Sequence, residues 1–262
     1  MKRLGVNIDH IATVRNARGE GHPSIILAAK YVMKCGANLI TIHLREDGRH
    51  IKKKDLINLS KLKFMPINLE LAANEKMLKV ALNYKPNFVC LVPEKRKEIT
   101  TEGGLNLKKN KIKIKKIIKI LNDRKIRTSL FINPNLKDVK IASFINTKCV
   151  EFHTGKISRL VKNKKNYKNE FKKILNCCKY ASSLGIEVHA GHGMDYKTAE
   201  ILSKIKEIKE FNIGHFIVGE SIFFGRSCNA PAVPNGFVSF RYLIETPHFE
   251  PSPKYSIILS FK

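Results

Sequence analysis

Short runs of β-branched and aliphatic residues alternate along this chain with longer segments whose apolar residues recur every three or four positions. The short runs are typical of buried strands, and the longer period is typical of amphipathic helices. Strands are predicted at residues 4–9, 39–44, 67–72, 88–92, 127–132, 149–154, 187–192 and 210–215. Helices are predicted near residues 24–35, 52–62, 75–84, 108–124, 137–146, 167–184 and 197–206.

This alternation determines the expected fold class. Strands separated by helices pair in parallel through right-handed crossovers. Eight such strands favour an α/β fold of the closed (β/α)8 TIM barrel type over an open doubly wound sheet. The motif G-x-G-x-x-G is absent from the start of the first helix, which argues against a Rossmann dinucleotide site. In a TIM barrel the active site lies at the carboxyl ends of the strands.

Length and composition agree with one barrel of this size. The chain has 262 residues, of which 43% are hydrophobic, and a single (β/α)8 domain usually needs about 250. Its apolar runs are all far shorter than the roughly 18 residues that span a bilayer. The first ten residues, MKRLGVNIDH, place polar side chains where a signal peptide would have an apolar core. We therefore expect a cytoplasmic protein with no membrane partner.

The charge is strongly positive, since 49 Lys and Arg residues face 22 Asp and Glu residues. The most basic segment, residues 106–125, also has Ile and Leu at helical spacing, as in an amphipathic helix with a solvated lysine face. A nucleic-acid interface would usually add arginines, interleaved aromatic residues or a known motif. We expect no nucleic-acid partner, and a lysine-rich exterior that binds nucleic acid or acidic partners is the alternative. The positive field also favours small phosphorylated substrates.

Polar residues gather at the predicted carboxyl ends of the strands, where the βα loops of a barrel converge. Seven of the nine histidines fall there, and burying so many imidazoles and carboxylates without a function would leave hydrogen bonds unmet. We therefore interpret this rim as an active site. The rim set is Asn7, Asp9, His10, His43, Arg45, Glu46, Asp47, His50, Glu70, Glu151, His153, His189, His192, Asn212 and His215.

The ends of the last two strands predict the kind of ligand. Residues 190–194 (AGHGM) and 212–215 (NIGH) contain glycines that let backbone N–H groups approach an anion. The loops after strands seven and eight often bind phosphate in this architecture, and Arg18 and Arg45 offer guanidinium groups to the same oxygens. The sequence lacks H-E-x-x-H and close His/Cys spacing, so we expect no metal. Residues 93–104 are expected to form a lid.

Several stretches together resemble the pyridoxine 5′-phosphate synthase family, in order and at natural spacing from residue 4 to about 225. They are GVNIDHIATVRNARG (5–19), TIHLREDGRHI (41–51), NLELA (68–72), LVPEKRKEITTEGGL (91–105), SLFI (129–132), EFHTG (151–155), AGHG (190–193) and FNIGH (211–215). The resemblance implies an enzyme of vitamin B6 biosynthesis. That family condenses 3-amino-2-oxopropyl phosphate with 1-deoxy-D-xylulose 5-phosphate to form pyridoxine 5′-phosphate, phosphate and water, by imine formation and acid/base-catalysed ring closure.

The same resemblance implies residue roles, an octameric assembly and no metal or organic cofactor. His43 and Glu70 match the general bases, His192 the proton donor and Glu151 a stabilising carboxylate. The positions that match binding of the amino-ketone phosphate are Asn7, Arg18, Gly193, Gly214 and His215. The positions that match binding of the deoxyxylulose phosphate are Asp9, His10, Arg45, His50 and Thr100. Another phosphosugar lyase or isomerase on the same barrel is the alternative activity.

The end of the chain departs from this resemblance. We expect residues 1–225 to form the single catalytic domain and residues 226–262 an atypical, Pro-rich tail in place of a last amphipathic helix. Proline breaks helices, so this tail is expected to pack irregularly and to add little to the barrel. Whether it permits full activity and octamer assembly stays open. Its prolines are Pro231, Pro234, Pro247, Pro251 and Pro253.

Overall fold

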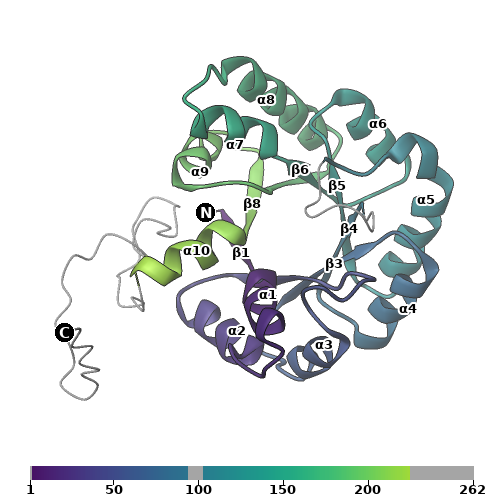
Figure 1. The fold of residues 1–262 in the computed structure, drawn as a ribbon. Coiled ribbons are helices and arrows are strands. Elements are labelled where there is room, and N and C mark those ends of the chain that lie inside the picture. The colour runs from purple at the N-terminus through teal and green to yellow at the C-terminus, as the bar shows by residue number, and fades with distance from the viewer. Residues whose placement is uncertain (1, 94–102, 225–262) are drawn as a thin grey trace, which may run out of the picture.

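The computed structural model describes residues 2–93 and 103–224. Eight parallel strands form a closed barrel in chain order, and the last strand pairs with the first. Figure 1 shows this ring of strands surrounded by helices. The predicted (β/α)8 TIM barrel is confirmed. The strands are β1 Arg3–Asn7, β2 Leu39–His43, β3 Ile67–Ala72, β4 Phe88–Val92, β5 Arg127–Ile132, β6 Cys149–His153, β7 Glu187–Gly191 and β8 Ile208–Ile213.

Five of the described helices begin at a side-chain cap. Ser24, Asn74, Asn106, Asn135 and Asp195 each accept a hydrogen bond from the backbone N–H three residues later, the usual signal for a helix start. The helices are α1 Asp9–Arg18, α2 Ile25–Lys34, α3 Lys53–Ser60, α4 Glu75–Tyr84, α5 Leu107–Asp123, α6 Leu136–Phe144, α7 Gly155–Lys162, α8 Lys168–Ser183, α9 Tyr196–Ser203 and α10 His215–Phe224.

Three of these helices, α1, α7 and α10, were not predicted from the pattern. Each starts two residues after a strand ends, and the first residues of α1 and α10 fall within the strands predicted at 4–9 and 210–215. Consequently Asp9, His10 and His215 lie in helices, and His192 lies after β7 rather than within it. Helix α10 also lacks an alternation of polar and apolar faces, since its sequence HFIVGESIFF is apolar nearly all round.

The hydrophobic core lies between the barrel and the helices. Outward-facing strand residues such as Ile40, Leu69, Leu130 and Phe152 are fully buried against the helix layer. Most TIM barrels also fill their interior with Val, Ile and Leu. Here the alternate, inward-facing positions are largely polar and buried, and the small apolar cluster inside consists of Cys90, Val92 and Phe131. The inward polar residues include Arg3, Thr41, Asn68, Arg127, Ser129, Glu151, His189, Glu210 and Asn212.

Charged residues close the amino end of the barrel. Glu210 Oε2 accepts from Arg3 Nε at 2.8 Å and from Arg127 Nη2 at 3.4 Å. Glu187 pairs with the same two arginines. His189 lies between the two carboxylates, with Nε2 2.7 Å from Glu187 Oε1 and Nδ1 3.2 Å from Glu210 Oε1. The placement of His189 at the catalytic rim is therefore wrong, because its side chain belongs to this floor.

Several sequence expectations fall outside the described residues. They concern the tail at 226–262, most of the expected lid at 93–104, and Thr100. Within the described part of the chain, none of the helices is long and apolar enough to cross a membrane.

Candidate active site

His43 and Glu70 form the centre of the barrel mouth. They are register partners, His43 at the end of β2 and Glu70 two residues before the end of β3, with His43 Nδ1 3.8 Å from Glu70 Oε2. Burial, followed by the charge of Arg45, lowers the pKa of His43 to about 3, so the imidazole is neutral. Burial, followed by the nearby Glu151 and Asp9 carboxyls, raises the pKa of Glu70 well above its usual value. Among the described residues, the buried His43 Nε2 has no hydrogen-bond partner.

Asp9 ties the first strand end to the second. It opens α1, and its carboxylate accepts the His43 backbone N–H at 2.8 Å and the Asn7 side-chain amide at 2.9 Å. Asn7 in turn accepts the Asp9 backbone N–H at 2.8 Å. Burial raises the pKa of Asp9 to about 7 in spite of these hydrogen bonds. Asp9 therefore positions the His43 backbone, and its own carboxyl titrates near neutral pH.

Glu151 lies deeper in the barrel, with 2% of its surface exposed. Its Oε2 accepts the Asn212 side-chain amide at 2.8 Å, and the Cys90 thiol lies 3.9 Å from the same oxygen. Burial, followed by the charge of Glu210, raises the pKa of Glu151 to about 8. Glu70 and Glu151 are thus two buried carboxyls with raised pKa, and such groups suit proton transfer near neutral pH.

A second imidazole group lies at the ends of β6 and β7. The rings of His153 and His192 stack with centroids 4.7 Å apart, and Phe131 packs edge-on against His153. The backbone of His192 and Gly193 is left-handed, with φ of 78° and 77°. The Thr154 hydroxyl donates to the carbonyl oxygen of His192 at 2.7 Å and to that of Gly191 at 2.8 Å. Thr154 therefore holds the turn that carries His192.

A third group consists of His10, His50 and His215, contributed by α1, the loop after β2 and α10. The His10 ring lies 4.7 Å from the His215 ring and 6.0 Å from the His50 ring, measured between centroids. Burial, followed by the positive charge of His10, lowers the pKa of His50 to about 4. His50 Nδ1 lies 2.8 Å from the Thr13 hydroxyl. The sequence motifs around residues 10, 50 and 215 thus converge as expected.

The two candidate arginines differ in their surroundings. Arg45 is buried, with 5% of its surface exposed, and its guanidinium lies 3.2 Å from Asp47 Oδ1. Arg18 lies at the end of α1, where its side chain is 76% exposed and pairs with Glu20 at 3.3 Å. The structure therefore brings Arg45 to the site and leaves Arg18 on the surface.

The two glycines expected to contact an anion also differ. Gly193 has a left-handed backbone, which favours glycine, and a Cβ there would lie 3.4 Å from Gly155 Cα. At Gly214 a Cβ would lie 2.8 Å from the Asn7 Cβ and 2.9 Å from the Asn7 carbonyl oxygen. The missing side chain at 214 therefore makes room for Asn7. Replacing Gly214 would displace a site residue directly, whatever the ligand.

Among the residues that the structure describes, two groups of side chains bring metal-binding atoms within 4.8 Å of one another. One consists of Asp9, His43 and Glu70, in which Asp9 already accepts two hydrogen bonds. The other consists of Cys149, Glu187 and His189, beside the guanidinium groups of Arg3 and Arg127, whose positive charge opposes a cation. Neither set favours a metal over the hydrogen bonds and ion pairs already formed. The expected absence of a metal stays a prediction.

Sequence reasoning missed Thr41, Asn68 and Cys90 as parts of the site. All three are buried, inward-facing residues one layer below the mouth. The available signal was the alternation of polar and apolar residues within strands such as LITIH and INLELA, because every second side chain of a barrel strand points inward.

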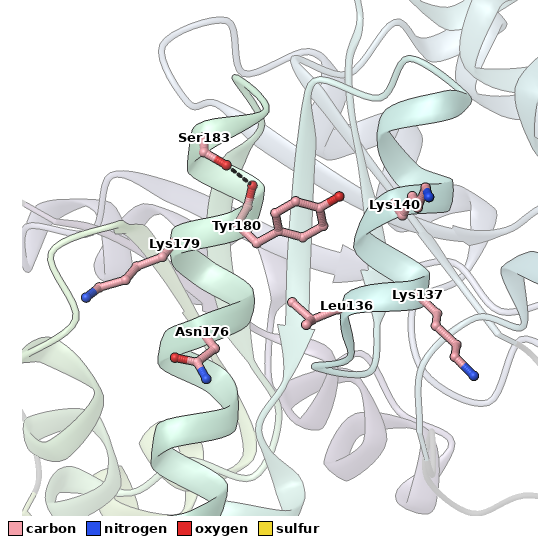
Figure 2. Close-up of a pocket in the computed structure, with 7 residues that line it drawn as sticks. All are labelled: Leu136, Lys137, Lys140, Asn176, Lys179, Tyr180 and Ser183. Carbon is pink, nitrogen blue, oxygen red and sulfur yellow. Dashed lines mark hydrogen bonds between the residues drawn. The ribbon is translucent and has the colours of Figure 1, made fainter.

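A separate groove of about 690 Å³ lies on the outside of the barrel between α6 and α8. Figure 2 shows Tyr180 and Asn176 of α8 facing Leu136 of α6 across it, with lysines around the rim. It shares none of its lining with the mouth, so it is not part of the candidate active site. The lining residues are Leu136, Lys137, Lys140, Asn176, Lys179, Tyr180 and Ser183.

Comparison with known proteins places this chain in a family. The family model described as "Pyridoxal phosphate biosynthesis protein PdxJ" matches residues 4–231. A relative from Pelagibacter ubique named pyridoxine 5′-phosphate synthase is 64% identical over 225 residues, which cover 86% of this chain and 94% of the relative. The enzyme of that name from Zymomonas mobilis is 49% identical over 223 residues, covering 85% and 86%.

A solved structure of the tryptophan synthase A-subunit from Pyrococcus furiosus matches with a TM-score of 0.56 and covers 87% of this chain and 92% of its own. Its 12% sequence identity supports the shared barrel fold alone. The family match and the high identity of the sequence relatives show the family as well as the fold. The chain therefore belongs to the PdxJ family of pyridoxal phosphate biosynthesis enzymes.

Proposed function

We propose that this chain is a pyridoxine 5′-phosphate synthase, which condenses 3-amino-2-oxopropyl phosphate with 1-deoxy-D-xylulose 5-phosphate. The products are pyridoxine 5′-phosphate, inorganic phosphate and water. The observation that carries the proposal is the pairing of a neutral, buried His43 with a Glu70 carboxyl of raised pKa in the barrel mouth. The names of the relatives at 64% and 49% identity support the same activity.

The reaction requires imine formation, loss of water and repeated proton transfer. We assign His43 as a general base, since its imidazole is neutral and its buried Nε2 makes no hydrogen bond to another described residue. Glu70 serves as the second base once it is ionised, and its raised pKa makes its carboxylate a stronger proton acceptor. The amine nucleophile comes from the substrate, so catalysis consists of positioning and proton transfer.

Glu151 and His192 complete the acid/base set from the opposite side of the barrel. Glu151 stabilises charge that develops on the closing ring, from a site below the mouth where its carboxyl is buried. His192 acts as the proton donor to the departing group. Its position is supported by the stacked His153 ring and by the hydrogen bond from Thr154.

The binding residues fall into two groups, one for each phosphorylated substrate. The mouth provides imidazoles, a buried guanidinium and a left-handed glycine turn, and these suit phosphate oxygens. For the amino-ketone phosphate we propose Asn7, Arg18, Gly193, Gly214 and His215. For the deoxyxylulose phosphate we propose Asp9, His10, Arg45, His50 and Thr100. The exposed Arg18 would have to move toward the mouth, or act within an assembly, to reach a substrate.

The proposal also includes the extent of the catalytic domain, the oligomeric state and the cellular location of the protein. Residues 1–225 form one catalytic domain that assembles into a homo-octamer in the cytoplasm, with small phosphorylated molecules as its partners and no nucleic acid. The family match over residues 4–231 supports the domain boundary within a few residues. In keeping with the family that the sequence resembles, the proposal includes no metal or organic cofactor.

The experiment that tests this proposal is a product assay on the purified chain with both substrates. Pyridoxine 5′-phosphate is followed by the absorbance of its pyridine ring and identified by mass. Each substrate alone is the control. Formation of the ring only when both are present supports the synthase. Isomerisation or cleavage of the sugar phosphate alone would instead indicate another phosphosugar enzyme.

A further inference from the structure

A chain of hydrogen bonds crosses the inside of the barrel below the active site. Asn68 Nδ2 donates to Thr41 Oγ1 at 3.4 Å, and the Thr41 hydroxyl donates to Asn212 Oδ1 at 3.0 Å. Asn212 Nδ2 then donates to Glu151 Oε2 at 2.8 Å. Four different strands contribute to this chain, and none of its members is more than 5% exposed. Such a buried network fixes its members only when each donor and acceptor has a partner.

The chain gives the Asn212 amide a single orientation. Its oxygen faces the Thr41 hydroxyl, and its nitrogen faces two carboxylates, Glu151 Oε2 and Glu210 Oε1 at 3.3 Å. The flipped amide would set its oxygen against both carboxylates. Without the Thr41 hydroxyl, one side of the amide would lose its partner and the preference for this orientation would weaken.

Two glycines leave the space that Asn212 and Glu151 occupy. A Cβ at Gly5 would lie 2.1 Å from Asn212 Oδ1, and a Cβ at Gly191 would lie 2.0 Å from Glu151 Oε1. Both glycines are register partners of Asn212, on β1 and β7. Neither has the left-handed backbone that would itself require glycine. The neighbouring strands are thus shaped around this amide and this carboxylate.

The second carboxylate that Asn212 contacts belongs to the barrel floor. Glu210 accepts hydrogen bonds from Arg3, Arg127 and Asn212, and His189 Nδ1 lies 3.2 Å from its Oε1. Burial alone would raise the pKa of Glu210, but His189 and the two guanidinium groups lower it below its usual value, so Glu210 is ionised. The Asn212 amide therefore lies between a fixed negative charge and the active-site Glu151.

We propose that Asn212, oriented by Thr41, is a positioning residue that holds the Glu151 carboxyl in place for catalysis. This inference rests on the proposed function, in which Glu151 stabilises charge during ring closure. Asn212 acts through Glu151 and does not itself touch the reacting atoms. Its N–H stabilises the ionised form of Glu151, whereas burial and the charge of Glu210 favour the protonated form. The other titratable groups that face Glu151 are Glu70 and the Cys90 thiol.

The first test measures Glu151 directly and needs no turnover. The carboxyl band of protonated Glu151 is followed by infrared difference spectroscopy during a pH titration, and the band is identified by its absence in Glu151→Gln. In Asn212→Leu, which removes the N–H donor and keeps the γ-branched shape, the midpoint moves upward by about one pH unit, because a donor to the charged form is lost. An unchanged midpoint would overturn the proposal.

The second test keeps Asn212 and removes only the group that orients it. Thr41→Val is isosteric, and it lowers kcat about tenfold or more while KM changes less than about threefold. The matched control is Thr128→Val, since Thr128 is equally buried but its hydroxyl donates to the Ile126 carbonyl oxygen at 3.3 Å. The control keeps both constants within about twofold.

If Thr41→Val retains the wild-type kcat, or if the control loses as much, the positioning role of Thr41 and Asn212 is refuted. A failure of the positioning role can be distinguished from a failure of the proposed function. A wild-type protein that forms no pyridine ring from the two substrates would refute that function. The infrared midpoint would still report whether Asn212 controls Glu151.

Discussion

Gly191→Ala is the substitution for which the structure gives the sharpest expectation. The new methyl group would lie 2.0 Å from Glu151 Oε1 and 2.9 Å from its Cδ. To restore ordinary contact the carboxylate must move by about 1.4 Å, more than its 2.8 Å hydrogen bond to Asn212 tolerates. A misplacement of about 1 Å at a reacting group can cost on the order of a hundredfold in rate.

We therefore expect Gly191→Ala to lower kcat about a hundredfold in the product assay. Overpacking of a buried site typically also costs about 1–3 kcal/mol of unfolding free energy, which urea unfolding measures. Gly21→Ala is the matched control, because a Cβ at Gly21 meets nothing within 4 Å and its backbone is not left-handed. Gly191→Ala with kcat within about threefold of the wild type would refute the assigned position of Glu151.

Three further predictions test other parts of the account. His43→Ala or Glu70→Gln lowers kcat about a hundredfold or more with little change in the urea midpoint, and wild-type turnover in either would remove its assigned role. Burial raises the pKa of Glu151 to about 8, so the folded state keeps a proton that the unfolded chain releases, and stability falls as pH rises from about 5 to 8. Urea unfolding at about pH 5 and about pH 8 measures this fall in stability, and Glu151→Gln makes it smaller. An unchanged fall in the variant would contradict the raised pKa of Glu151. Arg15 contacts both carboxylate oxygens of Asp55, at 2.6 and 2.9 Å, in a largely buried ion pair. Asp55→Asn breaks this pair and lowers the unfolding free energy by about 3 kcal/mol. A loss below about 0.5 kcal/mol would contradict a stabilising role for the pair.

The barrel could be predicted from the sequence because its outer core follows a simple rule. Outward-facing strand residues are aliphatic, and each strand is followed by a segment with helical spacing. The helices that directly follow strands could not be predicted by the same rule. In α1 the residues Asp9 and His10 look like a polar strand end, since only Ile8 separates them from β1.

The candidate site could be predicted only in part, because alternation does not give the height of a residue within the barrel. Strand β8 begins at Ile208, two residues before the predicted start, and its pairing with β7 shifts register at Val188 and His189. Two residues of strand correspond to roughly 6.6 Å. His189 is the third residue of β7, before the end of that strand, and its side chain contacts Glu187 and Glu210 at the floor. Register depends on packing across the whole barrel, which local sequence does not encode.

The role of the strand glycines was also not accessible from sequence. The glycines in residues 190–194 suggested close approach to an anion. The structure instead assigns Gly191 to the space beside Glu151, whereas Gly193 has the left-handed backbone expected of a turn. A glycine can make room for a ligand or for a side chain of the neighbouring strand. The sequence does not tell these roles apart, because the folded barrel determines which side chain lies beside each glycine.

The measurement that tests the central claim most directly is the product assay on the wild-type chain and Glu70→Gln side by side. The wild type should convert the amino-ketone phosphate and the deoxyxylulose phosphate into pyridoxine 5′-phosphate with release of one inorganic phosphate per ring. Glu70→Gln should fold normally and lose about a hundredfold in rate. Phosphate release without ring formation by the wild type, or ring formation at the wild-type rate by Glu70→Gln, would contradict the account.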